Sequence, residues 1–138
     1  MKSEFELDHI AIAVESLEKG RGFYEALGLG PMEVEVVPTE KVKTGFFEVA
    51  NGASIELLEA TDPESPVAKF IAKRGPGIHH ICLRVKNIRE VMKSLKAKGI
   101  QLIDSEPKPG AHNCLVAFIH PKSTGGVLVE LSEPQGDH

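Results

Sequence analysis

Two stretches of the chain decide its fold: Leu7-Asp-His-Ile-Ala-Ile-Ala-Val14 and Ile78-His-His-Ile-Cys-Leu-Arg-Val85. Each contains a histidine followed by bulky aliphatic residues at alternate positions, which is typical of a β-strand that packs one face on a core. A second pair of similar stretches follows in the same order, Gly52-Ala-Ser-Ile-Glu-Leu-Leu-Glu59 and Gly126-Val-Leu-Val-Glu-Leu-Ser-Glu133. Because both matches recur at nearly the same spacing, they indicate one module used twice.

Each module is predicted to contain a strand, a helix and three further strands. The first module covers about residues 5–61 and the second about residues 76–134, with a short helix expected between them at 65–73. Ser16 and Asn87 are expected to cap the helix of each module. The predicted strands are 7–14, 33–38, 42–50, 53–60, 78–85, 100–106, 114–120 and 126–132. The sequence therefore predicts an α+β fold of two tandem βαβββ modules in a single domain, residues 1–138.

Composition excludes several classes of protein. The chain has 138 residues, of which 41% are hydrophobic and 26% are charged, as expected of a folded globular domain. Its net charge of −4 disfavours binding to nucleic acid. No apolar run approaches the roughly 18 residues that span a bilayer, so we expect no membrane partner. The two cysteines, Cys82 and Cys114, lack the paired spacing of a disulfide or zinc motif, which favours the cytoplasm.

The polar residues of the strands fall on one face of each predicted sheet. Successive side chains of a strand point to opposite faces. His9 and Glu56 therefore lie opposite the bulky aliphatic face in the first module, and His80 and Glu130 do so in the second. Two modules related by a pseudo-twofold axis would bring these four side chains towards one centre.

Two imidazoles and two carboxylates suit one divalent ion, such as Co²⁺, Mn²⁺, Ni²⁺, Zn²⁺ or Mg²⁺, and leave positions for water or substrate. A carboxylate buried on an apolar strand is costly, and metal coordination would offset that cost. The predicted ligands are thus His9, Glu56, His80 and Glu130, with the mixed sheets curving around one metal-binding cleft. Asp8 or a backbone carbonyl is expected to orient the His9 imidazole.

Three motifs identify a family: Asp8-His-Ile-Ala-Ile-Ala-Val14, Gly77-Ile-His-His-Ile-Cys-Leu-Arg-Val85 and Gly125-Gly-Val-Leu-Val-Glu-Leu131. They resemble the vicinal-oxygen-chelate superfamily, and within it the methylmalonyl-CoA epimerases. The resemblance runs from about residue 5 to residue 133. Its more specific pieces are Asp62-Pro-Glu-Ser-Pro-Val-Ala-Lys-Phe70, Gly77-Ile-His-His80, Gly110-Ala-His-Asn113 and Ile119-His-Pro-Lys122.

The resemblance implies an acyl-CoA substrate, metal ligands at the same four positions and a homodimer. Methylmalonyl-CoA offers a carboxylate oxygen and a thioester oxygen that can chelate one ion, which stabilises the enolate formed when the C2 proton leaves. Interconversion of the 2R and 2S forms then needs an acid–base group on each face of C2. Glu130 is the first candidate for one of these catalytic bases.

The second base is where this sequence departs from the family. Some members have a glutamate on the third strand of the first half, and alignment from Gly52 and Glu56 puts Thr44 there. Glu48 lies four residues further along the same strand and, by alternation, on the same face as Thr44. It is the expected substitute, and the alternative is a solvated carboxylate at the strand end.

Two further residues are expected to bind substrate. His112, in the Gly110–Asn113 loop, lies near enough in the family pattern to contact the substrate carboxylate or thioester. Lys122, after His120-Pro121, is expected to contact a phosphate of coenzyme A. For both, an ordinary exposed turn residue is the competing interpretation.

Two other functions fit parts of the pattern. A glyoxalase I-type lyase, acting on a thiol hemithioacetal, would use the same four ligands, and Glu56 favours it because many epimerases carry glutamine at that position. A non-catalytic small-molecule-binding protein of the same fold would typically lack the ligand set.

Overall fold

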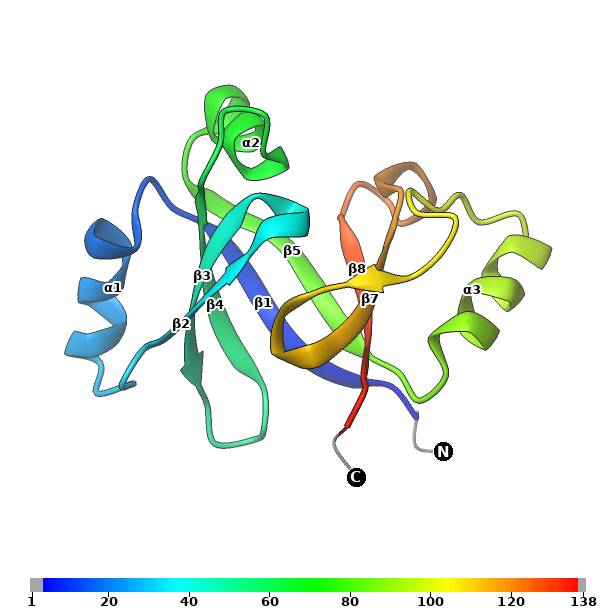
Figure 1. Ribbon diagram of the computed structural model, residues 1–138, viewed down its shortest axis with the longest axis horizontal. Helices are drawn as coiled ribbons and strands as arrows, with labels where there is room; N and C mark the ends of the chain where they lie inside the picture. The colour runs from blue at the N-terminus through cyan, green and yellow to red at the C-terminus, as the bar shows by residue number, and fades with distance from the viewer. Residues whose placement is uncertain (1–3, 137–138) are drawn as a thin grey trace. The chain divides into compact units, whose positions relative to one another are not determined.

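The computed structural model describes residues 4–136, and the chain divides into two compact units (Figure 1). Residues 9–79 form the first unit, whereas the residues from His80 onward form the second together with the N-terminal segment up to Asp8. No helix among the described residues is long and apolar enough to cross a membrane. The strands described below belong to a single mixed sheet of eight strands.

The first unit contains one copy of the predicted module. Its strands are β1 (Glu6–Ala13), β2 (Glu33–Val37), β3 (Val42–Glu48) and β4 (Ser54–Ala60), in the order β2-β3-β4-β1. β1 runs parallel to β4, and the other neighbours are antiparallel. Helix α1 (Leu17–Ala26) follows β1, and α2 (Pro66–Arg74) follows β4.

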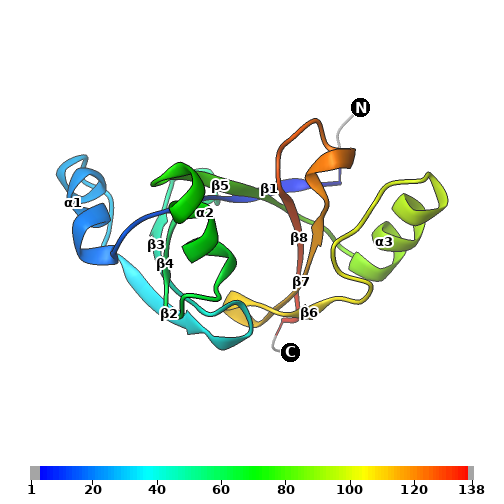
Figure 2. The same cartoon turned by 90° about the horizontal axis from the view of Figure 1, so that it is seen from above.

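The second unit repeats this order. Its strands are β5 (Gly77–Arg84), β6 (Lys108–Pro109), β7 (Cys114–Ile119) and β8 (Val129–Pro134), with helix α3 (Ile88–Ala97) after β5. The sheet order is β5-β8-β7-β6, and β5 runs parallel to β8 as β1 does to β4. The prediction of an α+β fold with two βαβββ modules is therefore confirmed (Figure 2).

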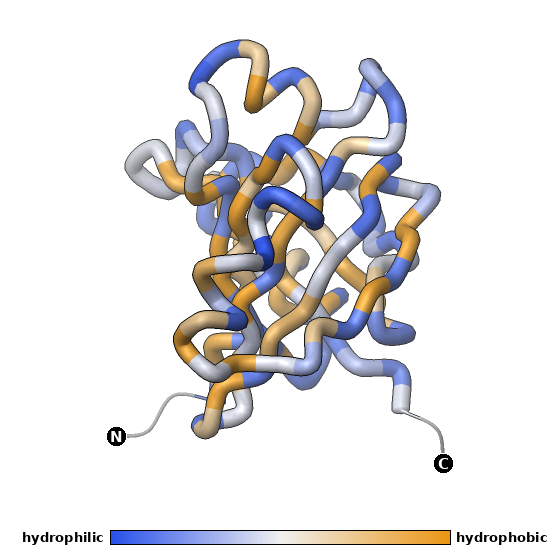
Figure 3. Tube along the Cα trace, turned by 90° about the vertical axis from the view of Figure 1, so that its left-hand side faces the viewer, coloured by the Kyte–Doolittle hydropathy of each residue, from blue (hydrophilic) through white to orange (hydrophobic). Residues whose placement is uncertain are grey.

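Each helix after the first strand covers the bulky face of the strands in its own module. In the first unit Leu17 of α1 packs with Phe47, Leu57 and Ile12. In the second unit the core contains Ile88 and Met92 of α3, with Leu131 and Ala117 of the sheet. Bulky aliphatic residues recur at alternate positions of β1 and β5, as the sequence pattern predicted, and Figure 3 shows the hydropathy of each residue along the trace. The opposite face of the strands in each module is thereby left for the polar residues.

Ser16 and Asn87 cap α1 and α3 as predicted, accepting hydrogen bonds from Lys19 N and Glu90 N. A second, unpredicted contact also recurs at these helices. The Glu59 carboxylate at the end of β4 accepts a hydrogen bond from Leu17 N at 2.7 Å, and Glu133 of β8 accepts one from Ile88 N at 2.8 Å. A carboxylate at a helix N-terminus satisfies an orphan N–H and interacts favourably with the helix dipole.

Two predicted strands are wrong in part. The prediction of a strand at 100–106 fails, because the Asp104 carboxylate accepts the hydrogen bond from Phe118 N at 2.7 Å and replaces a backbone acceptor of the ladder. Within 100–106 a single β-bridge, from Leu102 to Ile119, takes the place of the strand, and the short β6 follows outside this range. The strand predicted at 126–132 begins at Val129, since Gly126 has a φ of 102° that no strand adopts.

Replacing Glu59 or Glu133 by alanine is expected to lower the free energy of unfolding by about 1–2 kcal/mol each, because a helix N-terminal N–H loses its charged acceptor. Urea denaturation of each variant measures the change. Glu33→Ala is the matched control, since Glu33 is exposed on β2. Equal stability of all three variants would contradict a role for these carboxylates as helix caps.

Candidate active site

The first unit holds a buried histidine–glutamate pair. In the parallel register of β1 on β4, Ala11 pairs with Glu56, so His9, two residues before Ala11, shares the face of Glu56. His9 Nδ1 lies 2.9 Å from Glu56 Oε2. The two residues are only 6% and 5% exposed, and Ala11 between them is fully buried. A small residue at this position leaves room for the two polar side chains to meet.

The second unit repeats the strand register and the residue types of this pair, although its histidine meets the glutamate through the other ring nitrogen. Cys82 pairs with Glu130 across β5 and β8, and His80 precedes Cys82 by two residues. His80 Nε2 lies 3.0 Å from Glu130 Oε1, with the residues 5% and 8% exposed. The edge of the His80 ring meets Phe118, whose partner across β7 and β8 is Glu130. Phe46 occupies the equivalent position opposite Glu56, which extends the repeat to a third side chain.

The donor atoms in each pair suit a metal ion. Two ligands about 2.1 Å from one ion at a right angle would lie about 3.0 Å apart, close to both nitrogen–oxygen distances. Imidazole nitrogen and carboxylate oxygen are ligands that divalent transition metals accept. Burying an ionised carboxylate is expensive unless it is paired, so the adjacent histidine explains each buried glutamate, and a bound cation would stabilise it further.

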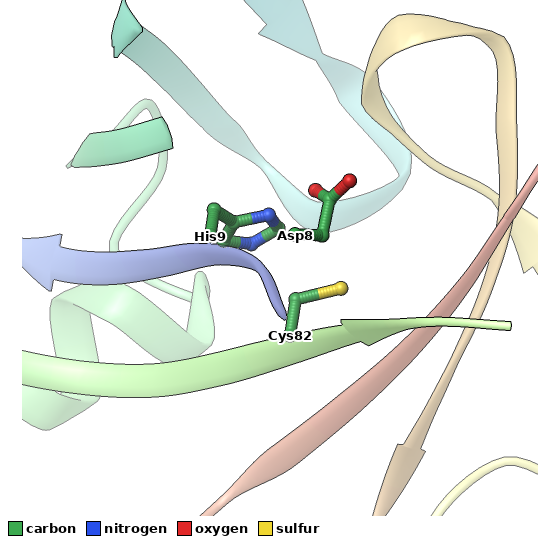
Figure 4. A group of neighbouring side chains, drawn as sticks. All are labelled: Asp8, His9 and Cys82. Carbon is green, nitrogen blue, oxygen red and sulfur yellow. The ribbon is translucent and has the colours of Figure 1, made fainter. Parts of the chain in front are cut away.

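Asp8, which was expected to orient the His9 imidazole, makes a contact with another residue that the sequence did not predict. Asp8 directly precedes His9 on β1, and Figure 4 shows these two side chains together with Cys82 of β5. Its Oδ1 accepts two hydrogen bonds from Arg84, at 2.9 Å from Nε and 2.8 Å from Nη2. These bonds raise the pKa of the Arg84 guanidinium above its usual value. Asp8 thus anchors Arg84, a partner that the sequence pattern did not indicate.

The candidates for the second base lie on β3. Thr44 pairs with Leu58 and Glu48 with Ser54, so both share the face of Glu56. Thr44 is buried, and its hydroxyl donates to the backbone carbonyl of Glu35 at 3.0 Å. Glu48 is exposed at the end of its strand. Glu48 therefore lies on the face of the sheet that the sequence predicted, but its side chain is exposed.

His112 and Lys122 lie on exposed turns at the two ends of β7. His112 belongs to a short 3-10 turn (Ala111–Asn113) and has a φ of 56°, an uncommon left-handed conformation for a residue other than glycine. Lys122 belongs to the turn Pro121–Ser123, and its backbone N–H donates to His120 Nδ1. The structure brings each predicted histidine into contact with its glutamate, whereas His112 and Lys122 are exposed to solvent.

Comparison with known proteins identifies relatives with a common activity. Residues 8–118 match the Glyoxalase/Bleomycin resistance protein/Dioxygenase superfamily. The human mitochondrial methylmalonyl-CoA epimerase is 43% identical over 129 residues, which cover 92% of this chain and 73% of the human protein. The crystal structure of methylmalonyl-CoA epimerase from Mycobacterium tuberculosis aligns with a TM-score of 0.89 at 35% identity, over 94% of this chain and 88% of that one.

A Streptomyces coelicolor methylmalonyl-CoA epimerase variant, solved in complex with 2-nitronate-propionyl-CoA, aligns with a TM-score of 0.88 at 31% identity. The alignment covers 97% of this chain and 100% of that chain. The relatives that carry the same fold thus include enzymes that act on or bind acyl-CoA compounds.

The His9→Ala variant is expected to lower the free energy of unfolding of metal-free protein by about 3–5 kcal/mol, because it removes the partner of a buried carboxylate. Chemical denaturation in the presence of a chelator measures this change. His120→Ala is the control, since His120 accepts only a local turn hydrogen bond among the contacts described above. A loss no larger than that of the control would show that Glu56 does not depend on His9.

Proposed function

Because this chain belongs to the Glyoxalase/Bleomycin resistance protein/Dioxygenase superfamily, we propose that it is a metal-dependent methylmalonyl-CoA epimerase, which interconverts the 2R and 2S forms by proton transfer at C2. The observation that carries the proposal is the buried His–Glu pair, present at the same register in both modules. The choice of methylmalonyl-CoA as the substrate rests on the relatives named above, which are methylmalonyl-CoA epimerases.

We propose that His9, Glu56, His80 and Glu130 together hold one divalent ion, which is Co²⁺, Mn²⁺, Ni²⁺, Zn²⁺ or Mg²⁺. Each module supplies half of this ligand set, so the two modules act as a single domain over residues 1–138. When bound, such an ion supplies Lewis-acid stabilisation of negative charge on the carboxylate and thioester oxygens of the substrate. The family resemblance supports this assignment, and the buried donor sets fit it.

Proton transfer and substrate binding are assigned to the following side chains. Glu130 is proposed to take up and return the C2 proton on one face of the substrate. Glu48, on the same face of the sheet as Glu56, is the candidate from the sequence for the other acid–base group. His112 is proposed to bind the substrate carboxylate or thioester, and Lys122 a phosphate of coenzyme A.

We also propose a homodimer and a cytoplasmic location, each from a single observation. The family resemblance supports a homodimer, which sedimentation velocity of the purified protein tests directly. Cys82 and Cys114, which form no disulfide in the part of the chain that the structure describes, support a cytoplasmic location, because thiols stay reduced in that compartment.

A glyoxalase I-type activity is the second candidate, and Glu56 is the observation that favours it. An acid at this position gives the site two carboxylates, as in the bacterial-type glyoxalase I pattern. A thiol hemithioacetal assay distinguishes the two reactions, since an epimerase has no activity on that substrate. A non-catalytic binding protein of this fold would show neither reaction.

Titration with divalent metal is expected to load one ion per chain and to stabilise the fold. At a free ion concentration of about 100 times the dissociation constant, the free energy of unfolding rises by about 2.7 kcal/mol. Isothermal calorimetry with Co²⁺, Mn²⁺ and Zn²⁺ measures the stoichiometry. His80→Ala should abolish the stabilisation and His120→Ala should retain it, so retained binding in both would refute the ligand assignment.

Deuterium exchange tests the reaction itself. Metal-loaded protein incubated with methylmalonyl-CoA in D₂O is expected to incorporate deuterium at C2, followed by mass spectrometry, and to lose this activity with a chelator. Exchange that depends on the metal supports enolisation of the substrate at this site. Absence of exchange by fully loaded protein would sink the epimerase proposal and leave the lyase or the binding protein.

A further inference from the structure

Inversion at C2 sets a requirement that one carboxylate cannot meet. The proton leaves one face of the substrate and a proton arrives on the other, so two acid–base groups must reach C2 from opposite sides. Glu130 is proposed as one of them. The family position for the other carries Thr44, whose hydroxyl donates a hydrogen bond to a backbone carbonyl and is a far weaker base than a carboxylate.

The register of β2 places another carboxylate beside Thr44. Glu35 pairs directly with Thr44 across β2 and β3, and Thr44 pairs in turn with Leu58 on β4. Residues paired in this way share a face of the sheet, so Glu35 lies on the same face as Glu56 and His9. α1 covers the opposite face, where Phe47 and Leu57 form the core.

Burial singles out Glu35 among the carboxylates of this face. Glu33 on β2 and Glu48 at the end of β3 are both exposed, whereas Glu35 is half-buried. The Thr44 hydroxyl donates to the Glu35 backbone carbonyl at 3.0 Å, which adds a side-chain contact to the ladder at this residue. A half-buried carboxylate on a fixed backbone suits proton transfer better than a solvated one, because its position and its water access are restricted.

We infer that Glu35 is the second acid–base group of the proposed epimerase. In one direction its carboxylate takes the C2 proton, the C–H bond breaks and the electron pair moves into the enolate. Glu130, initially protonated, then gives its proton to the opposite face of C2 and a new C–H bond forms. The reverse direction exchanges the two roles, so no further reactant is needed. This inference rests on the function proposed above.

The test follows each epimer separately. Wild-type protein and the Glu35→Gln variant, both loaded with metal, are incubated in D₂O with pure 2R or pure 2S methylmalonyl-CoA, and both deuterium at C2 and inversion are measured. Inversion by Glu35→Gln is expected to fall by about 10²- to 10⁴-fold, the usual contribution of a general acid or base. Deuterium should still enter one epimer, without inversion, because Glu130 can remove and return a proton on its own face.

Control variants distinguish an acid–base role of Glu35 from a structural role and from a role of another carboxylate. Glu33→Gln changes the nearest carboxylate on the same strand and should leave inversion unchanged. Glu48→Gln tests the competing carboxylate, and a selective loss of inversion in this variant, with Glu35→Gln still active, would overturn the inference in favour of Glu48. Slowing of exchange from both epimers equally in Glu35→Gln would indicate a structural role and overturn it as well. Wild-type protein without any exchange would instead refute the proposed function.

A second variant keeps the test decisive if Glu35→Gln does not fold or does not load metal. Glu35→Asp keeps the charge and withdraws the carboxylate by one methylene. It should slow exchange from one epimer more than from the other, because only one face of C2 depends on Glu35. Equal rates for the two epimers, relative to wild type, would contradict the assignment.

Discussion

The parallel register between the first and the last strand of each module is the constraint on which the site depends. Ala11 opposite Glu56 and Cys82 opposite Glu130 bring the preceding histidine beside the glutamate on one face. A shift of one residue in either pairing would move the glutamate to the core face, against α1 or α3. The small side chains at the paired positions are equally necessary, because a larger residue would fill the space where imidazole and carboxylate meet.

Burial of the two pairs has no adequate explanation in stability alone. A buried ion pair commonly contributes little net free energy, since desolvation of both groups opposes their attraction. The modules have better sources of stability in the apolar clusters under α1 and α3 and in the carboxylates of Glu59 and Glu133 at the helix N-termini. The proposed binding of a cation would account for four buried polar side chains in equivalent places.

Alternation within a strand was sufficient to predict which face of the sheet carries each histidine and glutamate, because parity depends on local sequence alone. It failed at 100–106, where the Asp104 side chain replaces a backbone acceptor, an event that requires knowledge of the partner strand. Glu35 was missed for a related reason. Its pairing with Thr44 depends on the turn before β3, where Lys41 adopts a φ of 55° that nothing in the local sequence predicts. Pairwise register, unlike parity, is set by turns and by tertiary packing.

The two modules match at their histidines and glutamates and differ at the position that pairs with Thr44. The corresponding position in the second module is Lys108, which pairs with Val116 and lies over the Phe118 ring, 5.5 Å from its centroid. One module thus carries a carboxylate where the other carries an ammonium group. The proposed ion would take one histidine and one glutamate from each half, whereas the proposed substrate, an acyl-CoA with one acidic carbon and one carboxylate, is not symmetric. A difference of charge at this one position, with the two His–Glu pairs kept alike, matches the asymmetry of that proposed substrate.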